Sequence, residues 1–205
     1  MRRVIAYVDG FNLYHAIADL KKPHLKWVDL HKLAQSICGS DETLMGVHYF
    51  TAYATWMPQQ VGRHKEYVKA LQHVGVRCVI GHFKEKPRQC KKCGARWVGH
   101  EEKETDVAIA VQLMADAFTD KFDRALIISA DSDMAPALRT IREHHPRRSL
   151  DVIAPPRRFG SARDLKPMLE ITQGRIAKCL LPETALAPDG TAIFTRPASY
   201  VLPGT

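Results

Sequence analysis

The stretch Arg3-Val4-Ile5-Ala6-Tyr7-Val8-Asp9-Gly10-Phe11-Asn12 decides the fold class, because an unbroken apolar run stops abruptly at an aspartate and a glycine. Unbroken apolar runs of this length are typical of strands that are buried on both faces of a parallel sheet. A second run, Ala125 to Ala130, stops in the same way at Asp131-Ser132-Asp133. In open α/β sheets the functional crevice lies outside the carboxyl ends of the strands, so we expect both acidic ends to border one pocket.

Strand-like apolar runs alternate with amphipathic, helix-like runs over most of the chain. The predicted strands are Val4 to Val8, Gly46 to Tyr53, Val76 to Phe83, Ala125 to Ala130 and Leu150 to Ala154. The predicted helices are Leu13 to Leu20, Leu30 to Ile37, Gln60 to Val74, Asp106 to Phe118 and Ala135 to His144. This alternation predicts an α/β domain with a mainly parallel central sheet that is covered on both faces.

Two segments interrupt the alternation. Lys84 to Glu102 is a basic insertion with Pro and Gly that separates a strand from the next helix. Pro182 to Thr205 is rich in Pro, Ala and Thr and has little charge, which predicts a loosely ordered tail. We therefore expect one domain over residues 1–181, with an insertion at about residues 82–100, and a tail over residues 182–205.

The charge balance suggests a partner for the acidic pocket. The 205 residues include 30 Lys and Arg against 22 Asp and Glu, a formal net charge of +8. A basic protein with an acidic pocket favours a polyanion that the surface attracts and the pocket holds, although a solubilising surface charge is the simpler alternative. The five cysteines lack the spacing of a disulfide scaffold, and no apolar run suits a signal peptide or a transmembrane helix. These features predict a cytoplasmic protein with no membrane partner.

The acidic residues at the strand ends form the candidate catalytic site, which comprises Asp9, Asn12, Asp106, Asp131 and Asp133. Crowded carboxylates repel one another unless a cation neutralises them, and oxygen ligands of this kind suit Mg²⁺ or Mn²⁺. We expect Asp9, Asp106 and Asp131 to bind the metal, while Asn12 and Asp133 complete the shell or hold water. The alternative is that each residue only caps a helix, a position that Asn and Asp favour. The recurrence of the pattern favours a metal-dependent phosphodiester enzyme.

A second metal site is predicted in the insertion. Cys90 and Cys93 are separated by two residues, so both thiolates can bind one Zn²⁺, and Gly94 permits the tight turn. His82 and His100 complete a four-ligand structural site, with Cys78 as an alternative to His82. A redox-active cysteine pair is the rival interpretation.

Basic residues gather around the cysteine pair, with Trp97 among them. They are Lys84, Lys86, Arg88, Lys91, Lys92 and Arg96, and a later series comprises Arg147, Arg148, Arg157, Arg158, Arg163 and Lys166. Cations beside an aromatic ring suit single-stranded RNA, whose phosphates and bases both need partners. The alternative is a solvated loop surface on which Trp97 packs over the zinc site.

Two other enzyme classes fit the sequence less well. Phosphatases and receiver-like domains that use a phosphorylated aspartate need Asp-x-Asp after the first strand, where this chain has Phe11. Dinucleotide-binding proteins carry Gly-x-Gly-x-x-Gly after a strand, and no predicted strand is followed by it.

Three ordered stretches resemble a known family. They are Val8-Asp9-Gly10-Phe11-Asn12, Glu102-Lys103-Glu104-Thr105-Asp106-Val107 and Ser129-Ala130-Asp131-Ser132-Asp133-Met134. Together they resemble the NYN domain of the PIN-like nuclease superfamily, in particular its LabA-like branch, over roughly residues 1 to 180. The resemblance implies a three-layer α/β/α sandwich and a metal-dependent endoribonuclease whose active-site set is the five residues named above. Family members commonly carry Gly where this chain has Ala130.

The alternative function is a catalytically weak module that keeps the fold and binds RNA or protein in a regulatory role, because a fold can outlive its activity. A homo-oligomer is compatible with either function.

Overall fold

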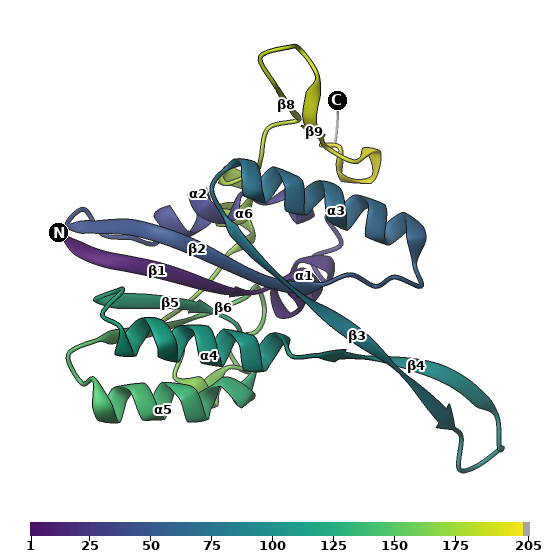
Figure 1. Cartoon of the computed structure of the whole chain (residues 1–205), viewed down its shortest axis with the longest axis horizontal. Helices are drawn as coiled ribbons and strands as arrows, with labels where there is room; N and C mark the ends of the chain where they lie inside the picture. The colour runs from purple at the N-terminus through teal and green to yellow at the C-terminus, as the bar shows by residue number, and fades with distance from the viewer. Residues whose placement is uncertain (203–205) are drawn as a thin grey trace.

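The computed structural model describes residues 1–202, apart from the side chain of Glu102, and its centre is a curled seven-stranded sheet (Figure 1). The strand order is β4-β3-β2-β1-β5-β6-β7. The bounds are β1 (Arg2–Asp9), β2 (Glu42–Ala52), β3 (Arg77–Gln89), β4 (Arg96–Lys103), β5 (Arg124–Ile128), β6 (Ser149–Ala154) and β7 (Leu169–Glu170). Neighbours from β3 to β7 pair in parallel, and β4 pairs with β3 in the antiparallel direction. The predicted α/β fold with a mainly parallel sheet is confirmed.

Helices pack on both faces of the sheet. One face is covered by α1 (Gly10–Ala18), α2 (Leu30–Gln35), α3 (Pro58–His73) and α6 (Gln173–Lys178). The other face is covered by α4 (Thr105–Phe118) and α5 (Ala135–His144), which lie side by side in Figure 1. Short 3-10 helices complete the fold, namely η1 (Pro23–Trp27), η2 (Ser132–Met134), η3 (Arg163–Leu165) and η4 (Ala198–Tyr200).

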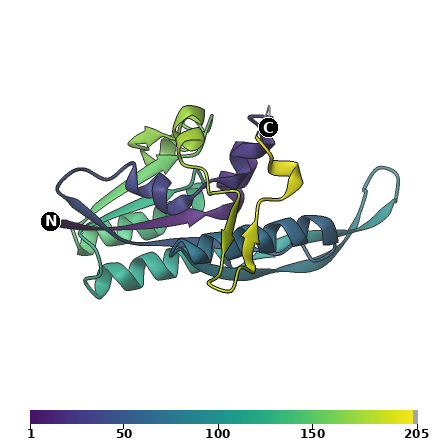
Figure 2. The same ribbon diagram turned by 90° about the horizontal axis from the view of Figure 1, so that it is seen from above.

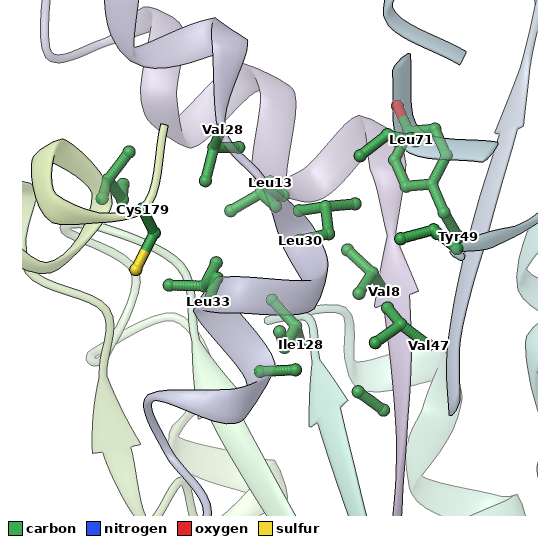
Figure 3. Close-up of a cluster of buried hydrophobic side chains, with 14 of the residues drawn as sticks. Val8, Leu13, Val28, Leu30, Leu33, Val47, Tyr49, Leu71, Ile128 and Cys179 are labelled. Atoms are coloured by element: carbon green, nitrogen blue, oxygen red, sulfur yellow. The ribbon is translucent and has the colours of Figure 1, made fainter. Parts of the chain in front are cut away.

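The central strand β1 contributes side chains to two separate hydrophobic clusters. Val4, Ala6 and Val8 face the cluster under α1, α2 and α3, part of which Figure 3 shows. Ile5 and Tyr7 face the cluster under α4 and α5. Because successive strand residues point to opposite faces and both faces are covered, every position of the run has to be apolar. This double burial explains the unbroken apolar pattern.

The predicted elements are found with shifted ends. Helix α1 begins at Gly10 and not at Leu13, while α4 begins at Thr105, one residue before the predicted start. The strand that was predicted to end at Phe83 continues to Gln89. Within residues 1–202, none of the helices has the length and apolar character needed to cross a bilayer.

The basic insertion is the tip of a long hairpin. Strands β3 and β4 pair from His82–Lys103 to Gln89–Arg96, and the hairpin extends away from the other elements in both views (Figures 1 and 2). The expectation of a compact metal-organised insertion is therefore not supported. The sequence obscured the strand because Pro87 interrupts it. Pro87 lies in the outer part of β3, which pairs with β4 alone, and proline is tolerated where one side of a strand is unpaired.

Regular structure forms within residues 182–202, the segment for which the composition predicted a loosely ordered tail. A second, two-stranded sheet forms from β8 (Thr184–Leu186) and β9 (Ala192–Thr195), and it packs against α3. Phe194 is 1% exposed and contacts the rings of Trp27 and His73. Tyr200 also contacts the ring of Trp27, so aromatic side chains anchor a segment whose composition otherwise predicts disorder. Residues 203–205 lie outside the described part of the chain.

A buried ion network joins three strands at the amino end of the sheet. Arg124 on β5 donates to Glu42 on β2 and to Asp151 on β6, each at 2.6 Å. The side chains of Arg124 and Glu42 are 9% and 4% exposed. Removing one partner from a buried pair leaves the other charge uncompensated, which costs more than the pair itself contributes.

We predict that Arg124→Met lowers the free energy of unfolding by about 3–5 kcal/mol, because Glu42 then stays buried without this cation. Urea denaturation followed by circular dichroism measures the change. The control is Arg2→Met, since Arg2 also pairs with Glu42, but at 3.4 Å and with a half-exposed side chain. This control should lose at most about 1 kcal/mol. Equal losses in the two variants would contradict the role of burial.

Candidate active site

Two hydrogen bonds help to hold Asp9 at the end of β1. Its Oδ1 accepts from the backbone N–H of Asn12 at 3.0 Å, and its Oδ2 accepts from the hydroxyl of Ser129 at 2.8 Å. The residue is 4% exposed. The first contact is a helix N-cap, so the capping interpretation is correct for part of this arrangement. The second contact connects Asp9 to another strand, which capping does not require.

The hydroxyl of Ser129 connects the ends of β1 and β5. It is buried, donates to Asp9, and accepts from the backbone N–H of Asp131 at 3.0 Å. A second link runs beside it, in which Oδ1 of Asn12 accepts from the backbone N–H of Ala130 at 3.1 Å. The structure therefore brings Asp9, Asn12 and Asp131 into one hydrogen-bonded unit at the carboxyl edge of the sheet.

Asp131 and Asp133 occupy the turn that follows β5. Oδ1 of Asp131 accepts from the backbone N–H of Asp133 at 2.9 Å and caps η2. Asp131 is half-buried, and Asp133 is exposed. The backbone of Asp133 therefore contacts the hydrogen-bonded unit, while its side chain is exposed to solvent.

Asp106 reaches this edge from the other face of the sheet. It lies in the first turn of α4, which begins on the side where β1 and β5 end and packs against η2 (Figure 1). Glu104, the residue before α4, has a left-handed backbone with φ of 75°, and its carboxylate lies 3.4 Å from Nδ1 of His82. Among the described residues, no three His, Cys, Asp or Glu side chains lie together closely enough to hold a metal ion. The carboxylates share an edge without forming a closed ligand group.

Ser129 is a residue of the candidate site that the sequence analysis did not single out. A signal for it is present, because it is the hydroxyl residue that directly follows the apolar run Ala125 to Ile128. Buried polar side chains need a hydrogen-bond partner, so a serine in this position should bind another strand end. Which strand end it meets depends on the strand order.

Gly10 is required by the close approach of β2. A Cβ atom at residue 10 would lie 2.5 Å from the carbonyl oxygen of Phe50 and 2.8 Å from the ring of Tyr49. Because Gly10 also starts α1, any side chain here would displace the turn that positions Asp9 and Asn12.

The predicted zinc ligands are not brought together. His100 is paired with Glu85, and His82 with Lys103, near the base of the hairpin. Cys90 lies five positions beyond Glu85 along an extended strand, a rise of about 17 Å, whereas zinc bonds measure about 2.0–2.3 Å. The ring of His100 instead stacks on Trp56 with centroids 3.6 Å apart. The predicted set of two histidines and two cysteines is therefore not supported, and Cys78 lies still farther along β3.

The cysteine pair forms the turn at the tip of the hairpin. The backbone N–H of Gly94 donates to the carbonyl of Cys90 at 2.9 Å, and Gly94 has the left-handed φ of 72° that favours glycine. Hydrogen bonds from the backbone of Cys93 and Lys92 lower the pKa of the Cys90 thiol. Burial acts in the opposite direction at Cys78, where it raises the pKa to about 12.

The two basic series differ in how far acidic residues neutralise them. In the hairpin, Glu101 pairs with Lys86, Arg88 and Lys103 at 3.0–3.2 Å, and the hydrogen bond from Lys86, followed by that from Lys103, lowers its pKa to about 2. In the later series, Arg148 binds Asp120, and Arg158 binds Asp19. The hairpin therefore keeps an excess of positive charge, while part of the second series serves the structure.

An α/β sheet with carboxylates and an asparagine at the ends of adjacent parallel strands is the framework of a PIN-like nuclease domain. The model of the NYN domain family matches residues 3–165. The chain therefore belongs to the NYN domain family, which is a PIN-like nuclease domain. The LabA-like branch stays a prediction.

Two further comparisons describe similar proteins. The chain is 27% identical to the 6-hydroxy-3-succinoylpyridine 3-monooxygenase HspA of Pseudomonas putida, over 88% of this chain and 70% of that protein. Its fold is also similar to that of a protein of unknown function from Vibrio parahaemolyticus, which is known from a crystal structure. That match has a TM-score of 0.58 and 17% identity, and it covers 88% of this chain and 96% of the other.

We predict that Gly10→Ala destabilises the protein by about 1–3 kcal/mol, because the added methyl group would overlap the Phe50 carbonyl. Gly62→Ala is the matched control, since Gly62 is exposed on α3 with nothing within 4 Å of the new Cβ. This control should gain up to about 1 kcal/mol from helix propensity. Thermal unfolding of both variants checks the prediction, and a Gly10→Ala protein as stable as wild type would contradict it.

The cysteines should differ in reactivity. At neutral pH the lowered pKa of Cys90 leaves more of it as thiolate, whereas burial raises the pKa of Cys38, Cys78 and Cys179. We predict that iodoacetamide at pH 7 modifies Cys90 before those three, as mapped by peptide mass spectrometry over time. Earlier labelling of Cys78 than of Cys90 would contradict the assigned geometry.

Proposed function

We propose that the protein is a metal-dependent endoribonuclease that hydrolyses phosphodiester bonds at the site formed by Asp9, Asn12, Asp106, Asp131 and Asp133. The observation that supports this most directly is the hydrogen-bonded unit of Asp9, Ser129 and Asp131 within an NYN domain. Helix capping alone would hold Asp9 and Asp131 at their own turns. The buried serine between them fixes two carboxylate-bearing turns relative to each other.

The donor set suits Mg²⁺ or Mn²⁺. These ions prefer oxygen ligands, and Mg²⁺ in particular is commonly bound through one or two carboxylates, with water and substrate phosphate in the other positions. Asp9 and Asp131 would hold the ion, and Asp106 would approach it from α4. When bound, the metal supplies an activated water and neutralises charge on the phosphate.

The protein's own groups position these carboxylates. Ser129 donates to Oδ2 of Asp9 and thereby orients that carboxylate relative to the turn after β5. Asn12 holds the same turn through the backbone N–H of Ala130. Asp133 is exposed and close by, so it suits the task of holding a water molecule at the rim of the site.

The hairpin suits single-stranded RNA as the substrate. Strand alternation and register assign Lys84, Lys86, Arg88, Trp97 and Lys103 to one face, together with Glu101 as its acidic residue. Trp97 is 50% exposed. A cationic face with an exposed aromatic ring can bind phosphates and stack on a base.

A second candidate function comes from the relative in Pseudomonas putida. Its name describes a monooxygenase that acts on a substituted hydroxypyridine, and the similarity extends over 88% of this chain. An oxygen-consumption assay with 6-hydroxy-3-succinoylpyridine and a reductant tests this candidate directly, and substrate-dependent oxygen uptake would favour it over the nuclease.

We predict that Asp9→Asn and Asp131→Asn each lower Mn²⁺-dependent RNA cleavage on the order of a thousandfold, because each removes a charged ligand whose metal contributes several kcal/mol to the transition state. Single-turnover cleavage of a mixed RNA pool measures the effect, with circular dichroism to verify folding. Asp164→Asn is the control, since Asp164 is exposed on η3. Cleavage by either site variant at the rate of the control would contradict the proposed active site.

A further inference from the structure

A cavity of about 110 Å³ lies beside the acidic site, on the face of the sheet that α1 and α3 cover. Its walls come from α1, the end of β2, α3, η1 and η4. Figure 3 labels three of the lining side chains, Leu13, Val28 and Tyr49. An apolar cavity of roughly 150 Å³ can hold benzene, so this space is on the scale of a single aromatic ring.

The buried wall of the cavity combines aromatic surface with a few polar atoms. Tyr49, Thr51 and Tyr67 are each at most 9% exposed. Nε2 of His64 lies 3.2 Å from Oγ1 of Thr51 and 3.5 Å from the hydroxyl of Tyr49. Burial lowers the pKa of His64 to about 4, so the imidazole is neutral at pH 7 and has both a donor and an acceptor nitrogen. These groups match a ring that carries both hydrogen-bond donors and acceptors.

The outer part of the cavity carries positive charge. Nζ of Lys26 donates to the hydroxyl of Tyr14 at 3.1 Å and lies 4.4 Å from the centre of that ring. Arg63 also lines the cavity, from α3. Both cations are half-buried, and Tyr14 is 39% exposed. The outer part therefore suits an anionic group attached to the ring.

The cavity is adjacent to the acidic site along the chain. Gly10 and Phe11 line it, and they directly follow Asp9, with consecutive Cα atoms about 3.8 Å apart. We propose that the cavity binds one six-membered nitrogen heterocycle with an anionic substituent, namely the pyrimidine base of the nucleotide next to the cleaved phosphodiester. The base lies against Tyr49 and His64, and its phosphate lies near Lys26 and Arg63. The assignment of the base to an RNA substrate rests on the proposed function.

Size gives the site its selectivity. A pyrimidine has one ring and a purine has two fused rings, so the pyrimidine is the better match for a cavity of about 110 Å³. The edge of a pyrimidine presents donors and acceptors to Thr51 and His64.

The test is isothermal titration calorimetry of the full chain, without divalent metal, using uridine monophosphate, guanosine monophosphate and uridine. We expect uridine monophosphate to bind at least about tenfold more tightly than guanosine monophosphate. Lys26→Ala should weaken uridine monophosphate about tenfold and leave uridine unchanged, because it removes one charged contact to phosphate. The matched control Lys121→Ala, an exposed lysine in the turn before β5, should bind like wild type.

Val61→Phe places an aromatic ring in the cavity wall and should abolish binding of uridine monophosphate. If this variant does not fold, as judged by its thermal melt, the binding measured for Lys26→Ala decides the outcome. Absent binding of uridine monophosphate, or equal binding of the two nucleotides, would overturn the proposal, as would unchanged binding to Lys26→Ala.

Two outcomes separate this inference from the nuclease proposal. Pyrimidine binding without any RNA cleavage would overturn the nuclease proposal and retain the heterocycle site. The natural ligand would then be a free heterocyclic acid that uridine monophosphate mimics. Cleavage without pyrimidine binding would retain the nuclease and overturn the site.

Discussion

The hydrogen bond from the buried hydroxyl of Ser129 to Asp9 is the contact on which the candidate site depends. It connects the two strand ends that carry the acidic residues. The hydroxyl oxygen of Ser129 also accepts a hydrogen bond from the backbone N–H of Asp131. The link forms because β1 and β5 are neighbours in the sheet although more than a hundred residues separate them in the chain. The fold thus converts two separate turns into one chemical unit. Gly10 at the start of α1 contributes too, because only a hydrogen atom fits between it and the Phe50 carbonyl on β2.

Much of the fold could be predicted because burial on both faces leaves a strong mark on the sequence. The run Val4 to Val8 is apolar at every position since its side chains enter two clusters in alternation. The short elements could not be predicted in this way. Helix α6 and strand β7 are too short to show a period, and β8 and β9 are held by a few apolar contacts, among them Phe194 against Trp27.

The candidate site was predictable in its residue types and less so in its assembly. Asp9, Asn12 and Asp131 come together because each follows or caps a strand end at one edge, which the topology rule anticipates. Ser129 was not predicted, because its hydrogen bond to Asp9 depends on β1 and β5 being neighbours, which the sequence does not show. The two histidines assigned to zinc were misplaced because spacing in the sequence was taken as proximity, while an extended hairpin separates them from Cys90. Strand pairing thus explains why the acidic residues were predicted correctly to meet and why the zinc ligands were not.

The central claim is that the edge formed by β1 and β5 holds a divalent cation through Asp9 and Asp131. Titration of Mn²⁺ into the metal-free protein, followed by electron paramagnetic resonance of the free ion, tests it without any assumption about the substrate. The account predicts saturable binding to wild type and to Asp164→Asn, and its loss in Asp9→Asn. Binding to Asp9→Asn with the stoichiometry and affinity of wild type would contradict it.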